Sequence, residues 1–207
     1  MSPPARRGRW IALEGGEGSG KSTQATLLAS SLGAVLTREP GGTPVGSEIR
    51  ALLLGAVDGG LDPKAEALLM AADRAQHVAS VVAPALAAGR DVVSDRSAWS
   101  SLAYQGYGRG LDVEWLRSVS DWAMGRCWPD VTVLIDVPLS VSRRRVAQTG
   151  RELDRLEAEG GGFHERVLEG FRVMAAGGGP WVVVDGGGAP EVVAAQVARA
   201  VAERLGE

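Results

Sequence analysis

Lysine is nearly absent from this sequence of 207 residues. Of its 22 basic residues only Lys21 and Lys64 are lysines, and the rest are arginines. Arginine carries a planar fork that does not replace a compact ammonium group in a confined site. A lysine that is kept inside a glycine-rich loop, as Lys21 is, therefore points to a specific task.

An excess of positive charge is also missing, since the formal net charge is −3. Proteins that coat nucleic acids rely on clustered Lys and Arg that neutralise phosphates. We therefore expect no nucleic-acid partner, and the composition favours small-molecule partners.

Cysteines and long apolar runs are equally scarce. The single cysteine, Cys127, cannot form an internal disulfide, which is typical of a reducing cytoplasm, and we expect it to be a small buried apolar residue. Residues 1–10 lead into only four apolar positions before the glycines, and no run reaches bilayer length. We expect neither a signal peptide nor a membrane partner.

Short apolar runs alternate with segments of helical spacing along the whole chain. Strands are expected at residues 10–13, 34–37, 91–96, 131–138 and 181–187. Helices are expected at residues 22–32, 62–82, 112–124, 140–149, 164–176 and 190–205, with Asp62 as an N-cap and Pro84 kinking or breaking the helix before it. This alternation predicts a doubly wound α/β fold with about five parallel strands and helices on both faces.

The length fits one domain. We expect a flexible tail at residues 1–8 and a single domain at residues 9–207. The glycine stretches at 160–162, 177–179 and 186–188 read as loops, and the first is expected to be the most mobile.

Residues 14–23, EGGEGSGKST, contain the spacing G-x-x-x-x-G-K-S between an expected strand and an expected helix. In that context backbone N–H groups and the helix N-terminus face a polyphosphate, the lysine reaches the β- and γ-phosphates, and the serine hydroxyl meets Mg²⁺. The sequence thus predicts a nucleoside triphosphate site. Its members are Gly15, Gly16, Glu17, Gly18, Ser19, Gly20, Lys21, Ser22 and Thr23.

Three kinds of protein share such a loop: switch GTPases, motor ATPases and phosphotransferases with an acceptor site. A GTPase would carry a base-reading N-K-x-D, which neither lysine allows. Charged residues do follow the other strands, namely Arg38 after the second and Asp95 with Arg96 after the third, at the edge where ligands bind in open α/β sheets. Together these clusters favour an acceptor site, although one Asp-Arg pair alone is as often structural.

Further polar candidates have ordinary explanations beside the functional one. Met70 and Arg74 share a helix face, yet they would also suit a core methionine beside a solvent-reaching arginine. Tyr104 and Gln105 could bind a polar ligand or merely cap a loop. The arginine-rich residues 143–155 resemble a solvated face.

Taken together, the segments resemble those of the thymidylate kinase family over nearly the whole chain, in order and spacing. The resemblance is carried by EGGEGSGKSTQ, TREPGGTPVGSEIRALLL, AADRAQH, SDRSAWSSLAYQGYGRG, PDVTVLIDVP and RELDRLE followed by FHERV. It implies a P-loop nucleoside monophosphate kinase fold with a lid at about residues 143–162. It also implies transfer of the γ-phosphoryl group of ATP to dTMP with Mg²⁺, by a chain that is usually a homodimer.

The resemblance also assigns roles by matching position. Arg74 would bond the thymine, Arg96 would hold the dTMP phosphate, and Asp95 would orient Arg96 or the metal's water. The implied dTMP site comprises Glu17, Arg38, Pro40, Arg50, Met70, Arg74, Arg96, Ser101, Tyr104 and Gln105. Ser22 would hold Mg²⁺, with Glu17 or Asp95 acting through water, and Glu17 would accept a hydrogen bond from the 3′-hydroxyl of dTMP.

Two departures from the family pattern matter. Met70 stands where a phenylalanine commonly stacks on thymine, and a thioether can still cover an aromatic face. The glycine loop lacks the arginine that some members carry, so the transition-state charge is expected from the lid. Arg151 and Arg155 are the leading candidates, ahead of Arg143, Arg144 and Arg145.

Two alternatives stay open at this point: a kinase for another pyrimidine nucleotide or nucleoside, and a P-loop protein that binds nucleotide without catalysis. The catalytic set expected from the resemblance is Lys21, Asp95, Arg96, Arg151 and Arg155. No histidine belongs to it, because an anionic phosphate oxygen needs no strong general base; His77 and His164 are expected to be surface residues or satisfied ones.

Overall fold

The computed structural model describes residues 6–55 and 60–206. Its centre is a five-stranded sheet in the order β2-β3-β1-β4-β5, in which every pair of neighbours is parallel. The strands are β1 (Trp10–Glu14), β2 (Val35–Arg38), β3 (Val92–Asp95), β4 (Val131–Asp136) and β5 (Trp181–Asp185). All lie within the expected apolar runs apart from single residues at their ends, and the prediction of about five parallel strands is confirmed.

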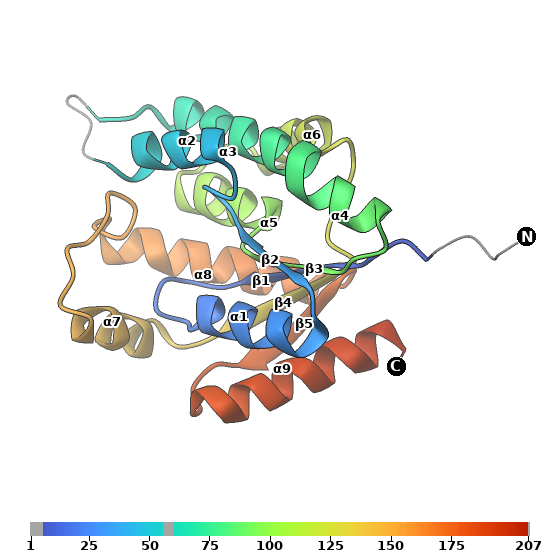
Figure 1. The fold of residues 1–207 in the computed structure, drawn as a ribbon. Helices are drawn as coiled ribbons and strands as arrows, with labels where there is room; N and C mark the ends of the chain where they lie inside the picture. Colours follow the sequence, from blue (N-terminus) through green and yellow to red (C-terminus); the bar gives the residue numbers. More distant parts are fainter. Residues whose placement is uncertain (1–5, 56–59, 207) are drawn as a thin grey trace, which may run out of the picture.

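Helices cover both faces of this sheet (Figure 1). They are α1 (Lys21–Leu32), α2 (Pro44–Leu54), α3 (Pro63–His77), α4 (Ala83–Ala87), α5 (Ala98–Ser101), α6 (Val113–Met124), α7 (Leu139–Gln148), α8 (Gly161–Ala176) and α9 (Pro190–Leu205). Two π-helical segments join them, η1 (Val78–Val82) before α4 and η2 (Leu102–Gly108) after α5. In the described ranges no helix is both long and apolar enough to cross a bilayer.

Each face of the sheet has its own core. α1 and α9 pack together against one face, where Ile11, Leu13 and Val133 contact their apolar side chains. The other face is covered by η2 and α8, which pack on each other around Phe163 and Phe171. The inner strands β1, β3 and β4 are buried on both faces and need apolar side chains, which explains their continuous apolar runs.

The break that the prediction allows at Pro84 does not occur. α3, η1 and α4 follow one another without an interruption, so Pro84 does not end the helix. A π-helical segment precedes it, and Pro84 lies in the first turn of α4, where a missing N–H is tolerated best. At the other end, Asp62 caps α3 as expected, since its carboxylate accepts from the N–H of Lys64 at 2.8 Å.

Three helical segments were not foreseen as such. α2 begins after Thr43, whose hydroxyl accepts from the N–H of Gly46 at 2.9 Å, and α5 with η2 fills residues 98–108, for which the sequence predicts no helix. α8 begins at Gly161, so two of the three glycines expected to form a mobile loop are helical instead. Glycine is a poor helix former, and packing of the following residues overrides that preference.

The start of the chain is anchored before the expected boundary at residue 8. Residues 1–5 lie outside the described ranges, but Arg7 pairs with Asp130, and the N–H of the buried Gly8 donates to the carbonyl of Leu86 at 2.9 Å.

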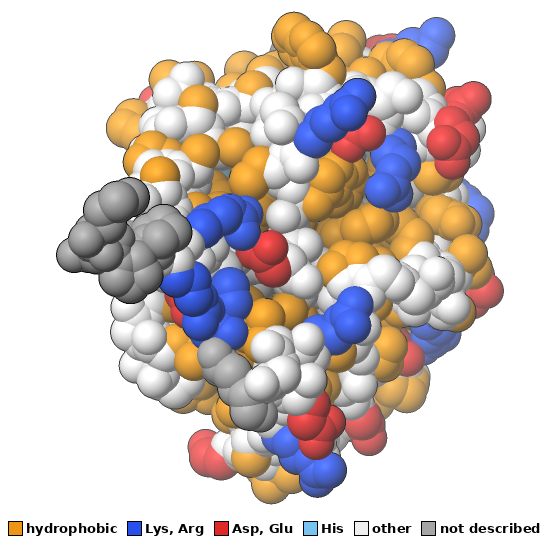
Figure 2. Space-filling model, turned by 90° about the vertical axis from the view of Figure 1, so that its right-hand side faces the viewer, with side chains coloured by type: hydrophobic (Ala, Val, Ile, Leu, Met, Phe, Trp, Pro, Cys, Tyr) orange, Lys and Arg blue, Asp and Glu red, His pale blue; other side chains and the backbone are white. Residues whose placement is uncertain are grey.

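Cys127 is half-buried and packs against the apolar cluster that contains Trp10. Seen from this end, basic, acidic and hydrophobic side chains are interspersed over the surface (Figure 2).

Candidate active site

The glycine loop joins the end of β1 to α1 in a conformation that only glycine allows at some positions. Gly15 has a φ of 145°, and a Cβ there would lie 2.7 Å from the carbonyl oxygen of Ile135. α1 begins at Lys21, which is 5% exposed and donates to the carbonyl of Gly16 at 3.2 Å. The loop therefore places a buried cation and a helix N-terminus at one edge of the sheet, as the spacing predicted.

Ser22 and Asp95 meet at that edge although they are 73 positions apart. The hydroxyl of Ser22 donates to one carboxylate oxygen of Asp95, and the other oxygen is buried without a partner among the described residues. Mg²⁺ prefers hard oxygen ligands and keeps several waters, so this oxygen pair fits such an ion. The described ranges hold no cluster of three His, Cys, Asp or Glu suited to a metal, so phosphates and water would complete the shell.

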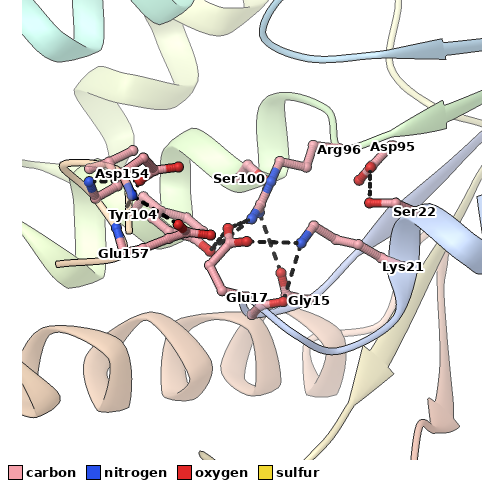
Figure 3. A network of polar contacts seen from close by, with 12 residues as sticks. Gly15, Glu17, Lys21, Ser22, Asp95, Arg96, Ser100, Tyr104, Asp154 and Glu157 are labelled. Carbon is pink, nitrogen blue, oxygen red and sulfur yellow. Dashed lines mark hydrogen bonds and ion pairs between the residues drawn. The ribbon is translucent and has the colours of Figure 1, made fainter. Parts of the chain in front are cut away.

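Glu17 lies between the lysine of the phosphate loop and the arginine that follows β3. Its carboxylate forms an ion pair with Arg96 and accepts from the hydroxyl of Tyr104 at 3.2 Å, while Lys21 lies 3.7 Å away (Figure 3). Burial alone would raise the pKa of Glu17, but the charges of Lys21 and Arg96 lower it well below its usual value. The carboxylate is thus ionised and turned toward the residues that follow β3.

Arg96 is held from several sides. Its φ is 74°, unusual for a residue other than glycine. Its guanidinium donates to Ser100 at 3.1 Å and to Tyr104 at 3.0 Å. Burial would lower the pKa of Arg96, whereas its interactions with Tyr104 and Glu17 raise it above the ordinary value. A strained backbone and a fixed side chain together are typical of a functional position.

The buried Glu14 supports this arrangement from below. Its carboxylate accepts from the N–H of Ser97 at 2.8 Å and from the hydroxyl of Ser100 at 2.6 Å, and Ser100 contacts Arg96. Burial raises the pKa of Glu14 to about 7, against the opposing effect of these hydrogen bonds. Sequence reasoning missed Glu14 because its partners, Ser97 and Ser100, lie 83 and 86 positions away along the chain.

A cavity of about 640 Å³ opens above these groups. It is lined by every residue of the expected dTMP site, together with Lys21, Ser22, Asp95 and Arg151. The expected dTMP-site residues on its wall are Glu17, Arg38, Pro40, Arg50, Met70, Arg74, Arg96, Ser101, Tyr104 and Gln105. Residues from five separate stretches of sequence thus converge on one space.

One wall of the cavity is strongly cationic. Arg50 donates to the carbonyl of Pro40 at 2.9 Å, and Arg38 lies beside the same turn, where it contacts Gly41. Burial, and then the like charges of Arg38 and Arg96, lower the pKa of Arg50. Cations that destabilise one another would be stabilised by an anion between them, which suits a phosphate group.

Arg74 is buried and fixed by hydrogen bonds to Glu39 at 2.8 Å and to Ser101 at 3.2 Å. Burial alone would raise the pKa of Glu39, but Arg74 and His77 lower it. His77 lies between Thr37 and Glu39 at 2.7 and 2.8 Å, so its expected satisfied role is confirmed. Sequence reasoning missed Glu39, which organises this network.

The lid arginines are placed differently from one another. Arg151 lines the cavity and pairs with Glu157 at 2.6 Å. Arg155 does not line it, since its guanidinium donates to the carbonyl of Leu53 at 2.9 Å and to Glu66 at 2.7 Å. Because its guanidinium does not reach the cavity wall, this placement speaks against Arg155 as a catalytic candidate.

The three arginines of α7 lie outside the large cavity. Arg145 donates to the carbonyl groups of Ser19 at 3.3 Å and Gly186 at 2.8 Å, beside the glycine loop. Arg143 lines a second, smaller cavity of about 430 Å³ together with His164, which is half-buried and contacts the carbonyl of Glu157 at 3.2 Å. α7 and the rest of the lid thus lie beside the glycine loop on the side away from β3.

A glycine loop with Lys21 and Ser22, a cationic second site across from it and a lid over both define a P-loop kinase of the nucleoside monophosphate type. The sequence model of the thymidylate kinase family matches residues 13–197. The chain belongs to the thymidylate kinase family, and its activity is that of a dTMP kinase, with ATP as the phosphoryl donor.

Individual relatives agree with this assignment over nearly their full length. A thymidylate kinase of Cereibacter sphaeroides is 47% identical over 213 residues, covering 97% of each chain. One from Leifsonia xyli subsp. xyli is 47% identical over 203 residues, covering 95% of this chain and 96% of the relative. The crystal structure of thymidylate kinase from Ehrlichia chaffeensis superposes with a TM-score of 0.76 at 32% identity, covering 94% of this chain and 99% of that one.

Proposed function

We propose that the large cavity binds dTMP with its phosphate toward Arg38, Arg50 and Arg96 and its base toward Arg74. The observation that carries this proposal is the convergence of the cationic wall and the buried Arg74 on one cavity that also reaches Lys21. A bound phosphate would relieve repulsion among the three guanidiniums. The base would then lie deeper in the cavity, where the wall is formed by Ser101, Tyr104 and Gln105.

Met70 would cover one face of the base. Its side chain is 9% exposed and lines the cavity from the same helix as Arg74. A thioether is polarizable and packs well against an aromatic ring. The phenylalanine common in the family is thus replaced by a group of similar reach and greater flexibility.

The ATP phosphates would lie on the glycine loop, with Lys21 at the β- and γ-phosphates and Mg²⁺ held by Ser22 and by Asp95 through water. When bound, Mg²⁺ neutralises charge on the phosphates. The protein's own part is to align the two phosphate groups and to surround the transferred one with cations, since the acceptor oxygen is already anionic. Lys21 and Arg96 approach the same point from opposite sides, with Glu17 between them (Figure 3).

The final positive charge would come from the lid. Arg151 lines the cavity while paired with Glu157. If Arg151 left Glu157 and bound the transferred phosphoryl group, its guanidinium would lie over the charge that develops there in the transition state. We therefore propose Arg151 as the catalytic arginine and not Arg155.

Glu17 would accept a hydrogen bond from the 3′-hydroxyl of dTMP. Its carboxylate already faces the Arg96 and Tyr104 side of the cavity. Glu17→Gln should lose about tenfold or more in kcat/KM with dTMP, because a charged acceptor is replaced by a neutral one. With 3′-deoxy-dTMP the same substitution should cost less than threefold, and equal losses with both substrates would remove the hydroxyl role.

A homodimer is supported by apolar side chains exposed on neighbouring helices. Leu52 on α2, Leu68 on α3 and Trp115 on α6 are 56%, 53% and 41% exposed. α2 packs on α3, and α3 packs on α6, along one side of the molecule (Figure 1). Exposed apolar surface shared by several elements is typical of a protein interface.

Leu68→Glu should therefore yield a monomer by light scattering, whereas Val192→Glu on α9, equally exposed at 55%, should not change the mass. A wild-type monomer would contradict the dimer. The single cysteine suits the cytoplasmic location that we propose for the enzyme.

The acceptor assignment is tested by ADP formation with dTMP, dUMP, dCMP and thymidine. The account predicts the highest kcat/KM with dTMP. A better acceptor among the other three would contradict it, and ATP binding without turnover of any acceptor would favour a non-catalytic role.

A further inference from the structure

Glu66 is a fully buried carboxylate behind the cavity wall. It lies in the first turn of α3, where the helix dipole favours negative charge, and its exposure is 0%. Burying a carboxylate is unfavourable unless it is paired and hydrogen-bonded. Neither the fold class nor the assignments above give this residue a task.

Three side chains from separate segments donate to it. Gln105 Nε2 lies 2.7 Å from Oε1, while Arg109 and Arg155 each reach Oε2, at 3.2 and 2.7 Å. A guanidinium can only donate hydrogen bonds, so both arginines use the carboxylate as an acceptor. The oxygens of Glu66 are therefore fixed as acceptors, toward Gln105 as well.

This acceptor determines how the amide of Gln105 is turned. Only the NH₂ group of an amide can donate, so it must face Glu66, and the carbonyl oxygen must point elsewhere. Gln105 is fully buried and lines the large cavity, and its Oε1 has no hydrogen-bond partner among the described residues. A buried acceptor of this kind is costly unless something donates to it.

We propose that Glu66 is a positioning residue for base recognition: it holds Gln105 so that Oε1 is presented as an acceptor to the base. This inference rests on the proposed placement of the base in the cavity. Thymine carries a hydrogen on N3 and can donate to Oε1. Cytosine carries a lone pair there, so two acceptors would face each other.

The lid is fastened to the same carboxylate. Arg155 bridges Glu66 and the carbonyl of Leu53, and Arg109 pairs with Glu159 at the end of the lid. Loss of Arg155 removes a lid contact but leaves the bond between Glu66 and Gln105. Arg155→Gln is therefore a matched control for Glu66→Gln.

The test compares kcat/KM for dTMP with kcat/KM for dCMP on the same enzyme sample, because that ratio does not depend on the fraction folded. In Glu66→Gln the amide of residue 66 can donate as well as accept, so Gln105 is free to turn. The ratio should fall by about tenfold, mainly through a higher KM for dTMP, with the KM for ATP within twofold of wild type. In Arg155→Gln the ratio should stay within twofold of wild type.

The double substitution Glu66→Gln with Gln105→Glu provides a rescue. The carboxylate at position 105 accepts from the amide at position 66 and still presents an oxygen to the base. The negative charge that balances Arg109 and Arg155 is kept, now at position 105. The ratio should return to within threefold of wild type, while Gln105→Glu alone, with two facing carboxylates, should be strongly impaired.

An unchanged ratio in Glu66→Gln, an equal fall in Arg155→Gln or a failed rescue would each overturn the positioning role. If the base does not bind in this cavity at all, Gln105→Ala would leave the KM for dTMP unchanged. A raised KM in Gln105→Ala together with an unaffected Glu66→Gln would overturn this inference alone.

Discussion

The floor of the large cavity, formed by the residues that follow β1 and β3, and the lid at residues 143–162 hold their cations in different ways. On the floor, the side chain of Arg96 is 13% exposed and bonded to Ser100, Tyr104 and Glu17. In the lid, the side chain of Arg151 is 48% exposed, and its hydrogen bonds go to Glu152 and Glu157 of the lid itself. One cation is built into the sheet edge, and the other is carried by a segment that binds its own counter-ion.

The difference separates substrate binding from the chemical step. Charge that is fixed before the substrates arrive needs no reorganisation during the reaction. A lid that brings the last cation also excludes water and completes the site only when both substrates are present. Substitutions on the floor should therefore change both binding and turnover, and substitutions in the lid should change turnover.

The largest effect is expected on the floor, from Lys21→Met. Loss of the buried ammonium beside the phosphates should lower kcat by about a thousandfold, with thermal unfolding close to wild type. Lys64→Met, at the exposed second lysine, is the control and should be fully active. Near-normal turnover in Lys21→Met would remove the phosphate role of the loop.

In the lid, Arg151→Ala should lower kcat by about a hundredfold and leave both KM values within threefold. In the wild type this guanidinium acts only on the transferred phosphoryl group, so its loss lowers kcat and not substrate binding. Arg155→Gln should keep kcat within fivefold, because its partners lie outside the cavity. The opposite order of losses would make Arg155 the catalytic residue.

A smaller effect is expected deeper on the floor. Arg74→Ala should raise the KM for dTMP by about thirtyfold, the loss of charge-assisted hydrogen bonds to the base, and change the KM for ATP by less than threefold. Steady-state kinetics with each substrate varied in turn would show this. A larger change for ATP would move Arg74 out of the acceptor site.

The last expected effect is a pH dependence of stability, which comes from Glu14 beneath the floor. The raised pKa of Glu14, about 7 against 4.5, means that the folded state takes up a proton more readily than the unfolded chain. Its contribution to stability is therefore complete below pH 4.5 and lost as the pH rises through about 7, by roughly 3 kcal/mol at most.

Glu14→Gln lacks this titration. Urea unfolding of both proteins at pH 5, 6, 7 and 8 should show the wild type losing stability relative to the variant up to about pH 7 and running parallel above it. Parallel curves throughout would mean that Glu14 has an ordinary pKa.

Much of this architecture could be predicted from the sequence, because the patterns that indicate it are local. The continuous apolar runs predicted the strands, and the loop spacing predicted the place of Lys21 at the sheet edge. The loop prediction is wrong for residues 161 and 162, because the burial of Phe163 and Val167 stabilises a helix that glycine disfavours.

The supporting carboxylates could not be predicted, since their partners are distant in sequence. Glu66 meets Gln105 and Arg155 across 39 and 89 positions, and no local pattern reports such contacts. The same holds for Arg155, whose position in the lid predicts a catalytic arginine although its partners lie outside the cavity.

The separation of floor from lid is tested most directly by calorimetric titration of dTMP, without ATP, into the wild type and into Arg151→Ala. We expect equal dissociation constants within twofold, although the variant turns over about a hundredfold more slowly. A dissociation constant at least tenfold higher in the variant would contradict it, because the lid cation would then belong to the dTMP site.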